Sequence, residues 1–454
     1  MVRYEKYKDS GIAWIGEIPK HWRIGRIKRL GRVLTGTTPS TSIEKYFDCE
    51  DINWYTPTDF SDENIYLNNS NRHLSQTVLD EKIVQLYPPK CVLLIGIGGT
   101  LGRIGYAVDR CYSNQQINAI VFNNGVIPLY YAYSLQPIKA YIWSNANTAT
   151  MPILNQSATK NLFVAIPPTT EQEQIAKYLD WKCREIDRIV EVRERQIKLL
   201  GELRTSVISR AVTHGLNPNA PLKDSGIDWI GQIPKHWKTI KLKYIFTFGK
   251  GLNITKEDLV ESGMPVISYG QIHSKENHGT GVKESLKRFV NGDYLKTNRQ
   301  SLVNNNDFIF ADTSEDLEGV GNCVFVDNNE MLFAGYHTIT LKVKNMQHNK
   351  YLAYLFLSDL WRTQIRSRVT GVKVFSITKT ILNFNTVLLP PIAEQQQIAE
   401  YLDKKTAEID STINKFKVQI DKLKEYRQAL ITEVVTGKID VRGIEIPTPK
   451  TTNR

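Results

Sequence analysis

Three glycines, Gly96, Gly98 and Gly102, give residues 95–105 (IGIGGTLGRIG) the composition of a loop that could approach a phosphate closely. Their spacing is G-x-G-x-x-x-G, which is not the dinucleotide-binding pattern, and no long helical pattern follows. Tyr106 and the residues after it continue as a strand pattern, which favours a tight turn between strands. Two alternatives stay open: a nucleotide-binding loop, and a turn that brings its backbone or Arg103 to DNA.

Other residues that could carry catalysis lack the necessary spacing. The eight histidines form no metal-binding pair, there is no glycine–lysine phosphate loop, and no Asn-Pro-Pro-aromatic tetrapeptide, which amino-methylating enzymes use to hold a flipped base. The five cysteines contain no CxxC pair, so neither a zinc site nor a disulfide framework is indicated. We therefore expect no catalytic residue, no metal ligand and reduced, mostly buried thiols.

The composition is that of a basic globular protein. With 454 residues, of which 41% are hydrophobic and 23% charged, the chain has room for two or three domains. No apolar run reaches the roughly 18–20 residues of a membrane helix, and the N-terminus lacks the apolar core of a signal peptide. We expect a cytoplasmic protein without a membrane partner. The net charge of +11 favours an acidic partner, with nucleic acid first, although a generally basic protein is an alternative.

The positive charge is concentrated in two large blocks. Residues 1–165 hold 17 basic against 13 acidic residues, and residues 216–388 hold 21 against 16. The segments 166–215 and 389–440 are nearly neutral, with 9 against 8 and 8 against 9. An acidic partner is therefore expected at the two blocks rather than at the segments that follow them.

A fifteen-residue segment occurs twice, as KDSGIAWIGEIPKHW at residues 8–22 and as KDSGIDWIGQIPKHW at residues 223–237. We call each copy a KHW motif. The separation of the two copies is far longer than the period of solenoids or propellers, so each repeated unit is domain-sized. Its tryptophans, isoleucines, glycines and proline are typical of a buried, turn-rich segment. We interpret the motif as structural, marking where each block begins.

A second duplication has the pattern of a long helix. IPPTTEQEQIAKYLD starts at residue 166 and LPPIAEQQQIAEYLD at residue 389. Pro-Pro followed by Glu favours a helix start, because the first turn does not use its N–H groups in intrahelical bonds and is stabilised by negative charge. Apolar residues then recur every seven positions, as in a coiled coil. The expected packing residues are Leu179, Ile186, Leu200 and Val207 in the first copy and Leu402, Ile409, Phe416, Leu423 and Leu430 in the second.

A helix of about 42 residues needs another element to cover its apolar stripe, because a long amphipathic helix is not stable alone in water. Two such helices in one chain can cover each other, and we expect an antiparallel coiled coil related by a pseudo-twofold axis. Each KHW motif starts a block just after a helix ends. The first copy should therefore meet the end of the second helix, and the second copy the end of the first.

The order block, helix, block, helix resembles the DNA-specificity subunit of Type I restriction–modification systems. The resemblance rests on PPTTEQEQIAKYLD and PPIAEQQQIAEYLD, each followed by EID, and on AVTHG (211–215) and VVTGK (434–438). In the first block LTGTTPS (34–40), INWYTPTDF (52–60) and SNQQINAIVF (113–122) resemble a target-recognition domain. In the second block PVISYGQI (265–272), FAGYHTITLKV (333–343) and GVKVFSITKTILNFNTVLLPP (371–391) do the same. The resemblance spans essentially the whole chain.

The resemblance implies an α+β fold with two globular α/β target-recognition domains separated by two long helices. The expected parts are domain 1 (1–165), the central helix (166–215), domain 2 (216–388), the C-terminal helix (389–440) and a tail (441–454). It also implies a non-catalytic subunit in which each domain reads one half of a split site in double-stranded DNA. The helices would set the spacer and dock two methylation subunits that carry S-adenosylmethionine. Restriction subunits that use ATP and Mg would join them, and this chain itself would hold no cofactor.

Contacts to DNA need amide, guanidinium and ammonium groups for base edges, and hydroxyl and basic groups for phosphates. In the first block the candidates are Thr56, Thr58, Asp59, Arg103, Asn114, Gln115 and Gln116. In the second they are Tyr269, Gln271, His273, Lys275, His337, Arg366, Arg368 and Lys373. For each of them, turn capping or plain surface exposure is an alternative explanation.

Taken together, these features favour a non-catalytic DNA-reading subunit over a coiled-coil scaffold without nucleic acid and over a self-sufficient enzyme. Absent or salt-independent DNA binding would indicate the scaffold, and methyl transfer by the purified chain would indicate the enzyme. The DNA sequence that is read does not follow from the amino-acid sequence.

Overall fold

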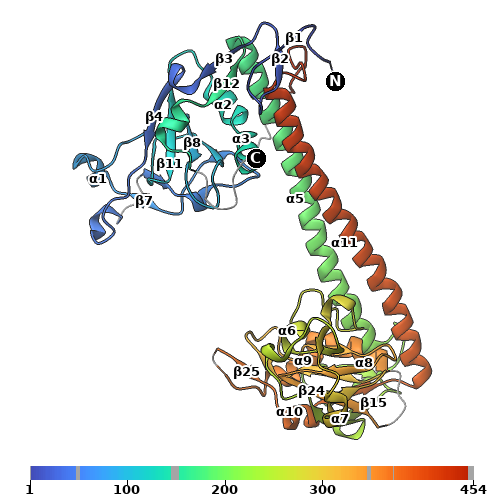
Figure 1. Cartoon of the computed structure of the whole chain (residues 1–454). Coiled ribbons are helices and arrows are strands. Elements are labelled where there is room, and N and C mark those ends of the chain that lie inside the picture. The colour runs from blue at the N-terminus through green and yellow to red at the C-terminus, as the bar shows by residue number, and fades with distance from the viewer. Residues whose placement is uncertain (1, 48–51, 145–152, 345–348, 372, 448–454) are drawn as a thin grey trace. The chain divides into compact units, whose positions relative to one another are not determined.

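The computed structural model describes residues 2–47, 52–144, 153–344, 349–371 and 373–447. The chain divides into two compact units. Unit 1 comprises Met1–Glu194 and Phe416–Arg454, and unit 2 comprises Arg195–Lys415. Each unit holds one mixed block of strands and short helices, together with one section of each of the two long helices, which Figure 1 draws in green and red. The predicted α+β class is confirmed.

The two long helices are α5 (Thr169–His214) and α11 (Ile392–Val435), of 46 and 44 residues. Both begin directly after a Pro-Pro pair, whose missing N–H groups a first helical turn does not need. The chain leaves α5 through Gly215 and passes Gly437 after α11, with a φ of +71° at each glycine, a conformation that only glycine adopts without strain. The Pro-Pro starts and glycine ends are therefore the local causes of the helix boundaries.

Within each unit the two helix sections run antiparallel. In unit 1 the Arg193 guanidinium lies 4.7 Å from the Phe416 ring centroid, and Asp187 lies 3.5 Å from Arg427. Residue numbers therefore increase along α5 in the direction in which they decrease along α11. In unit 2 Ile208 and Val212 of α5 share one core with residues of α11, among them Ile398 and Leu402. The residues expected in the seam are buried at Leu179, Ile186, Leu402, Ile409 and Leu430, and half-buried at Leu200, Val207, Phe416 and Leu423.

The block of unit 1 is built on two sheets. A five-stranded sheet has the order β4 (Gly31–Thr35), β11 (Ile117–Phe122), β8 (Cys91–Ile95), β9 (Ile104–Ala107) and β6 (Tyr66–Leu67). A three-stranded sheet has the order β10 (Cys111–Ser113), β5 (Ile52–Tyr55) and β7 (His73–Leu74). All five residues of β8 are buried, because α2 (Pro128–Ser134) packs on β8 and β9 and the other face meets the residues around Tyr55. The remaining helices are α1 (Gln76–Asp80), α3 (Ile138–Ser144) and α4 (Gln156–Lys160).

The block of unit 2 has a similar plan with two four-stranded sheets. One has the order β16 (Phe246–Lys250), β24 (Thr338–Val343), β20 (Phe308–Ala311) and β22 (Cys323–Phe325), and the other β18 (Arg288–Val290), β17 (Met264–Ile267), β23 (Leu332–Ala334) and β19 (Leu302–Val303). A short pair joins β21 (Thr313–Ser314) to β25 (Phe375–Ser376). The helices are α6 (Tyr269–Ile272), α7 (Tyr294–Thr297), α8 (Asn349–Leu357), α9 (Asp359–Arg366) and α10 (Lys379–Phe384).

Each KHW motif forms a small hairpin followed by a strand that pairs with the strand leading into the long helix. The hairpins are β1 (Tyr7–Asp9) with β2 (Glu17–Pro19), and β13 (Leu222–Asp224) with β14 (Gln232–Pro234). The following strands are β3 (Arg23–Arg26), paired with β12 (Phe163–Ile166), and β15 (Lys238–Lys241), paired with β26 (Thr386–Leu389). The last strand of each block, which leads into the long helix, is therefore paired with a strand from the start of the same block.

The glycine-rich stretch is a tight turn between antiparallel strands. Leu94 of β8 pairs with Ile104 of β9, and the Ile95 N–H donates to the Arg103 carbonyl over 3.0 Å. Gly98 has a φ of +102°, and a Cβ at Gly96 would stand 2.4 Å from the Leu154 carbonyl oxygen. The glycines are thus required by turn conformation and close backbone approach. The stretch has the strand–turn–strand context that favoured the turn over a nucleotide-binding loop.

Among the described residues the thiols are free and buried, at Cys91, Cys111, Cys183 and Cys323, while Cys49 lies outside the described residues. Within that same part of the chain no group of histidine, cysteine and acidic residues has the arrangement of a metal site. No helix of the described chain is long and apolar enough to cross a membrane.

Candidate nucleic-acid interface

In unit 1 two polar turns lie side by side at one edge of the three-stranded sheet. Strands β5 and β10 are parallel neighbours, with Tyr55 opposite Ser113. Because parallel strands end at the same edge, the turns that follow them, residues 56–59 and 114–116, are brought together. The Asn114 N–H donates to the Tyr55 carbonyl over 3.0 Å, which fixes the two turns to each other. We call this place the edge of unit 1.

The first of these turns is held by its own side chains. The Asp59 carboxylate accepts hydrogen bonds from the Thr56 N–H at 2.7 Å and from the Thr56 hydroxyl at 2.9 Å. Its other oxygen accepts from the Asn71 N–H at 2.8 Å. Thr56 and Asp59 therefore form a capping box that shapes the turn, whereas Thr58 is exposed at its tip with only its hydroxyl near that of Thr56.

The second turn divides in the same way between shaping and exposed residues. Asn114 is buried, and its side chain exchanges hydrogen bonds with the N–H and the side-chain oxygen of Gln116, at 3.1 and 3.0 Å. Gln115 is exposed and accepts a hydrogen bond from the Thr38 hydroxyl. Thr38 was not among the predicted residues. The loop that carries it follows β4 and approaches closely because a side chain at Gly36 would strike the Asn114 carbonyl.

Unit 2 repeats this arrangement with other side chains. Strands β17 and β23 are parallel neighbours, with Ile267 opposite Ala334, and a capping box again follows the first strand. There the Ser268 N–H donates to the Gln271 side chain over 3.1 Å. The residues after the second strand are 335–337, and His337 is the exposed one at their end. We call this place the edge of unit 2.

Aromatic rings gather at the edge of unit 2. The Tyr269 ring lies 5.4 Å from that of His337 and 6.3 Å from that of His273, centroid to centroid, and Tyr336 joins them at 5.7 Å. The His273 Nε2 faces the Thr313 carbonyl at 2.8 Å and must therefore carry the proton there. Tyr336 was not among the predicted residues. Its only sequence signal was its place between a glycine and a histidine after a buried strand.

The other predicted residues of unit 2 are more dispersed. Lys275 is exposed just after α6, and Lys373 is exposed two residues before β25, whose partner β21 contains Thr313. Arg366 donates to the Asp359 carboxylate and the Glu318 carbonyl, at 3.0 and 2.8 Å. Arg368 donates to the Asn385 side chain at 3.1 Å and lines a separate pocket. The structure thus brings four of the eight predicted residues together, Tyr269, Gln271, His273 and His337.

Arg103 is engaged in an ion pair beside the β8–β9 turn. Its guanidinium donates to the Asp62 carboxylate at 2.6 Å and to the Phe60 carbonyl at 3.2 Å, and Lys139 contacts the same carboxylate. Burial works against the charged form of Asp62, but the hydrogen bonds from Arg103 and Lys139 outweigh it and lower the pKa of Asp62. The Arg103 charge is therefore largely neutralised within the block.

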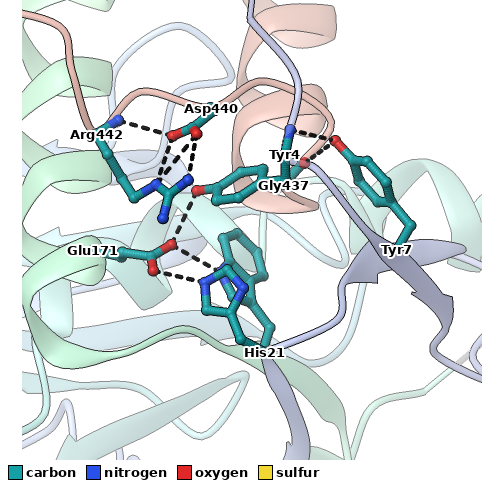
Figure 2. A network of polar contacts seen from close by, with 8 residues as sticks. Tyr4, Tyr7, His21, Glu171, Gly437, Asp440 and Arg442 are labelled. Carbon is teal, nitrogen blue, oxygen red and sulfur yellow. Dashed lines mark hydrogen bonds and ion pairs between the residues drawn. The ribbon is translucent and has the colours of Figure 1, made fainter.

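The KHW motif is a structural joint between a block and its helices, as Figure 2 shows for unit 1. The Glu171 carboxylate, in the first turn of α5, accepts from the Trp22 indole at 2.9 Å and the Tyr4 hydroxyl at 3.0 Å, and lies 2.7 Å from His21 Nε2. Burial, reinforced by Glu171, raises the pKa of Tyr4 far above its ordinary value. The Tyr7 hydroxyl, just before the motif, donates to the carbonyl of Gly437, just past α11, and a Cβ at Gly437 would stand 3.1 Å from the Trp22 ring of the motif. The first motif therefore meets the end of the second helix, as predicted.

Unit 2 has the same joint. Glu394 of α11 accepts from the Trp237 indole at 3.1 Å and lies 2.7 Å from His236 Nε2. A Cβ at Gly215, just past α5, would stand 3.2 Å from the Trp237 ring. The second motif therefore meets the end of the first helix, and this prediction is also confirmed. The two units therefore share the same joint between block and helix, whereas the side chains at their edges differ.

The family relationship follows from two matches that coincide with this repeat. The sequence model of the Type I restriction modification DNA specificity domain matches residues 19–198 and again residues 234–421. The chain belongs to this family. Each match starts near the end of a KHW motif and takes in most of one block and the first half or more of one long helix, so the specificity domain is present twice.

Relatives of the specificity-domain family match along the whole chain. The MjaIX specificity subunit of Methanocaldococcus jannaschii is 24% identical over 452 residues, covering 98% of this chain and 99% of the relative. The MjaVIII specificity subunit of the same organism is 22% identical, covering 94% and 95%. A solved chain from a study of complex assembly and conformational transition of the type I R-M system has a TM-score of 0.69 at 15% identity, covering 93% of this chain and 99% of that one. The HsdS subunit from Thermoanaerobacter tengcongensis has a TM-score of 0.53 at 14% identity, covering 93% and 98%. These likenesses establish the fold.

Proposed function

We propose that this chain is the non-catalytic, sequence-reading subunit of a type I restriction–modification enzyme, and that each block reads one half of a split DNA site. One observation carries the proposal: the two edges share a scaffold of parallel strands and capping turns, but differ in the side chains they expose. Unit 1 exposes Thr58 and Gln115, whereas unit 2 exposes His337 beside the Tyr269 ring. A repeated scaffold with unlike tips suits two different half-sites.

Amide and imidazole groups can distinguish bases through hydrogen bonds in the major groove. We assign base contact first to Gln115 and His337, the exposed amide and imidazole of the two edges, and the shaping role to Asp59, Asn114 and Gln271. Thr56 and Gln116 stand with the shaping residues, because their side chains are occupied inside the turns. Lys275 and Lys373 are free for phosphate contact at the rim of the unit 2 edge.

The experiment is methylation mapping in cells that express this chain with a methylation subunit. The expected pattern is methylated adenines within a two-part sequence with a fixed unread gap. Exchanging residues 1–165 for the first block of another specificity subunit should change one half of that sequence and preserve the other. A change of both halves, or of neither, would contradict the assignment of one half-site to each block.

We further propose that the two helices set the gap and that their repeated outer faces dock two methylation subunits, which supply S-adenosylmethionine. Restriction subunits using ATP and Mg would complete the enzyme. The support is the internal repeat, because equivalent faces bind equal partners. Native mass measurement of the purified complex should give two methylation subunits per chain. One methylation subunit per chain at saturation would contradict the proposal.

The scaffold and self-sufficient enzyme alternatives are separated from this proposal by two simple assays. The complex should bind duplex DNA with an affinity that falls steeply as salt rises, since phosphate neutralisation releases counterions. The purified chain alone should transfer no methyl group to DNA. Salt-independent or absent binding by the complex would favour the scaffold, and methyl transfer by the chain alone would favour the enzyme.

A further inference from the structure

Besides the joint and the edge, each unit carries a strip of positive charge at equal positions of the repeat. From within each KHW motif onward the chain contains a long run without any acidic residue, at residues 18–43 and 229–256. Four basic positions in these runs correspond when the two KHW motifs are aligned. We call them the basic strips: Lys20, Arg23, Arg26 and Lys28 in unit 1, and Lys235, Lys238, Lys241 and Lys243 in unit 2.

The strips follow β3 and β15 and end in the short turns of residues 27–29 and 242–244. Seven of the eight side chains are exposed, and Lys243 is half-buried. Among the described residues, no carboxylate forms an ion pair with a cation of the strips. The histidines that neighbour the strips, His21 and His236, do contact carboxylates, at the joints. The strips therefore present positive charge that the units themselves do not neutralise.

Aromatic and amide groups hold the inner cations in place. In unit 1 the Arg26 guanidinium lies 4.8 Å from the Phe163 ring centroid and donates to the Asn161 side chain over 3.2 Å. In unit 2 the ammonium groups of Lys241 and Lys243 lie 5.4 and 5.7 Å from the Phe384 ring centroid. A cation over a ring keeps its charge, so these contacts order the side chains while leaving them able to bind an anion.

We propose that the two basic strips bind the phosphate backbone of duplex DNA and hold each block on DNA whatever the sequence of its half-site. The inference rests on the proposed DNA-reading function and adds a surface separate from the edges. Base contacts must differ between blocks that read different half-sites, whereas the phosphate backbone is the same under both. Cations that repeat at equal positions therefore suit the backbone.

The residue types support contact with phosphate rather than with a carboxylate of a partner. Arg23 and Arg26 of unit 1 correspond to Lys238 and Lys241 of unit 2, so the repeat keeps the charge and discards the guanidinium fork. Bidentate recognition of a partner's carboxylate depends on that fork, whereas attraction to a phosphate tolerates either cation. The two strips share positive charge, which is the property that binding to a phosphate requires.

The surroundings favour a polyanion over a protein partner. Protein interfaces are depleted of charged residues at their centre and polar at their rim. The strips instead carry one sign over runs without an acid. In unit 2 Lys241 also borders a pocket of about 570 Å³ lined by Arg368, Thr378 and Thr380, which are phosphate-binding types, with Asp228 as the carboxylate among its lining residues.

The test uses the full chain in complex with its methylation subunit and a random-sequence 30-base-pair duplex as probe. The variant R26Q/K28Q/K241Q/K243Q removes the inner two cations of each strip. Its affinity for the random duplex and for a duplex with the mapped site should fall by the same factor, roughly tenfold or more for each strip at moderate salt. The slope of log affinity against log salt should become shallower by up to about 0.9 for each phosphate that is no longer neutralised.

Two matched variants serve as controls. R26K/K28R/K241R/K243R keeps the charge and should bind like the wild type. K82Q/R110Q removes two exposed cations of unit 1 that lie outside the repeated segments, and should leave the salt slope nearly unchanged. Circular dichroism melting of each variant checks that the fold is retained.

Each other outcome overturns the inference. Unchanged DNA binding with loss of the methylation subunit would make the strips a protein-docking surface, and loss of binding to the mapped site alone would make them base readers. Loss of binding in the charge-preserving variant would show that geometry matters rather than charge. Failure of the wild-type complex to bind any duplex would refute the proposed function itself, which is a result distinct from equal binding by wild type and variant.

Discussion

The indole of Trp22 donates a hydrogen bond to the Glu171 carboxylate over 2.9 Å, linking the end of a KHW motif to the first turn of α5. Trp237 and Glu394 make the same bond over 3.1 Å in unit 2. Each pair joins residues that are distant in the sequence, one at the start of a block and the other just past its last strand. The bond thereby fixes both ends of a block onto one helix turn.

The two joints differ in burial, which leads to the first prediction. The Glu171 side chain is 9% exposed and has a third partner in Tyr4, whereas the Glu394 side chain is 24% exposed. Glu171→Gln should therefore destabilise unit 1 by about 2–3 kcal/mol, since a buried charged acceptor is lost and donors are left unpaired. Glu394→Gln should cost unit 2 about 1–2 kcal/mol. Hydrogen–deuterium exchange, read separately for each unit, measures both effects. Equal losses would mean that the third partner and the burial contribute nothing.

A pair of equivalent ion pairs provides the second prediction, which concerns pH. Asp187 faces Arg427 at 3.5 Å in unit 1, and at the same repeat positions Asp410 faces Arg204 at 3.1 Å in unit 2. Burial, only partly offset by Arg427, raises the pKa of Asp187 above its ordinary value. A carboxyl whose pKa is higher in the folded state favours folding when protonated, so its contribution declines as pH rises through the interval between its unfolded and folded pKa values.

Asp187→Asn should therefore not destabilise unit 1 at pH 7, and should raise its free energy of unfolding by less than about 1 kcal/mol, because the side chain is half-exposed and screened. The gain should decline as the pH falls through the interval between the folded and unfolded pKa values of Asp187, where the wild-type carboxyl becomes protonated in the folded state. Thermal melts at several pH values test this, with Asp410→Asn as the matched control in unit 2. A loss of stability at pH 7, or a gain that persists in acid, would contradict the assignment.

Much of the fold was predictable because the chain repeats itself. The duplicated KHW and Pro-Pro-Glu segments indicated the helices, the number of units and the meeting of each motif with the end of the other helix. The edges were harder. The parallel pairing of β5 with β10 joins strands that are distant in the sequence, and nothing in the spacing of Thr56 and Asn114 reveals it.

Residue type alone could not fully separate the side chains that shape the turns from those that are candidates for DNA contact. Short polar side chains stabilise turns and contact DNA with the same groups, so Asp59 and Asn114 could not be told from Gln115 without the turn geometry. The repeated cations were visible in the sequence, because Arg26 and Lys241 occupy equal positions in runs without acids. Their signal is the repetition of charge within one chain rather than the identity of the residue.

The third prediction separates the two edges. Gln115→Ala should relax base preference in the half-site read by unit 1, and His337→Ala in the half-site read by unit 2, each by about 1–3 kcal/mol of discrimination. Asp59→Ala should instead weaken unit 1 as a fold, because its carboxylate holds the turn. Methylation mapping of the three variants measures the sequence change, and thermal melting measures stability. If Gln115→Ala altered the half-site of unit 2, the assignment of one edge to each half-site would be wrong.

The fourth prediction concerns the distance between the half-sites. If the helices set that distance, four residues inserted after Gly201 of α5 lengthen the helix by about 6 Å, which corresponds to one or two base pairs of DNA. Gly201 suits the insertion because no atom lies within 4 Å of a Cβ there, and Leu199 and Leu203 beside it are exposed. Ile208 and Val212 then keep their places in the core of unit 2.

Methylation mapping should show both half-sites unchanged and a longer unread gap between them. Gly201→Ala is the matched control, since it keeps the length, improves helix propensity by about 1 kcal/mol and should leave the gap as it was. A three-residue insertion turns the apolar stripe the other way and should lower stability instead. An unchanged gap in the four-residue variant, with methylation retained, would mean that the blocks find their own distance on DNA and that the helices serve only to connect them.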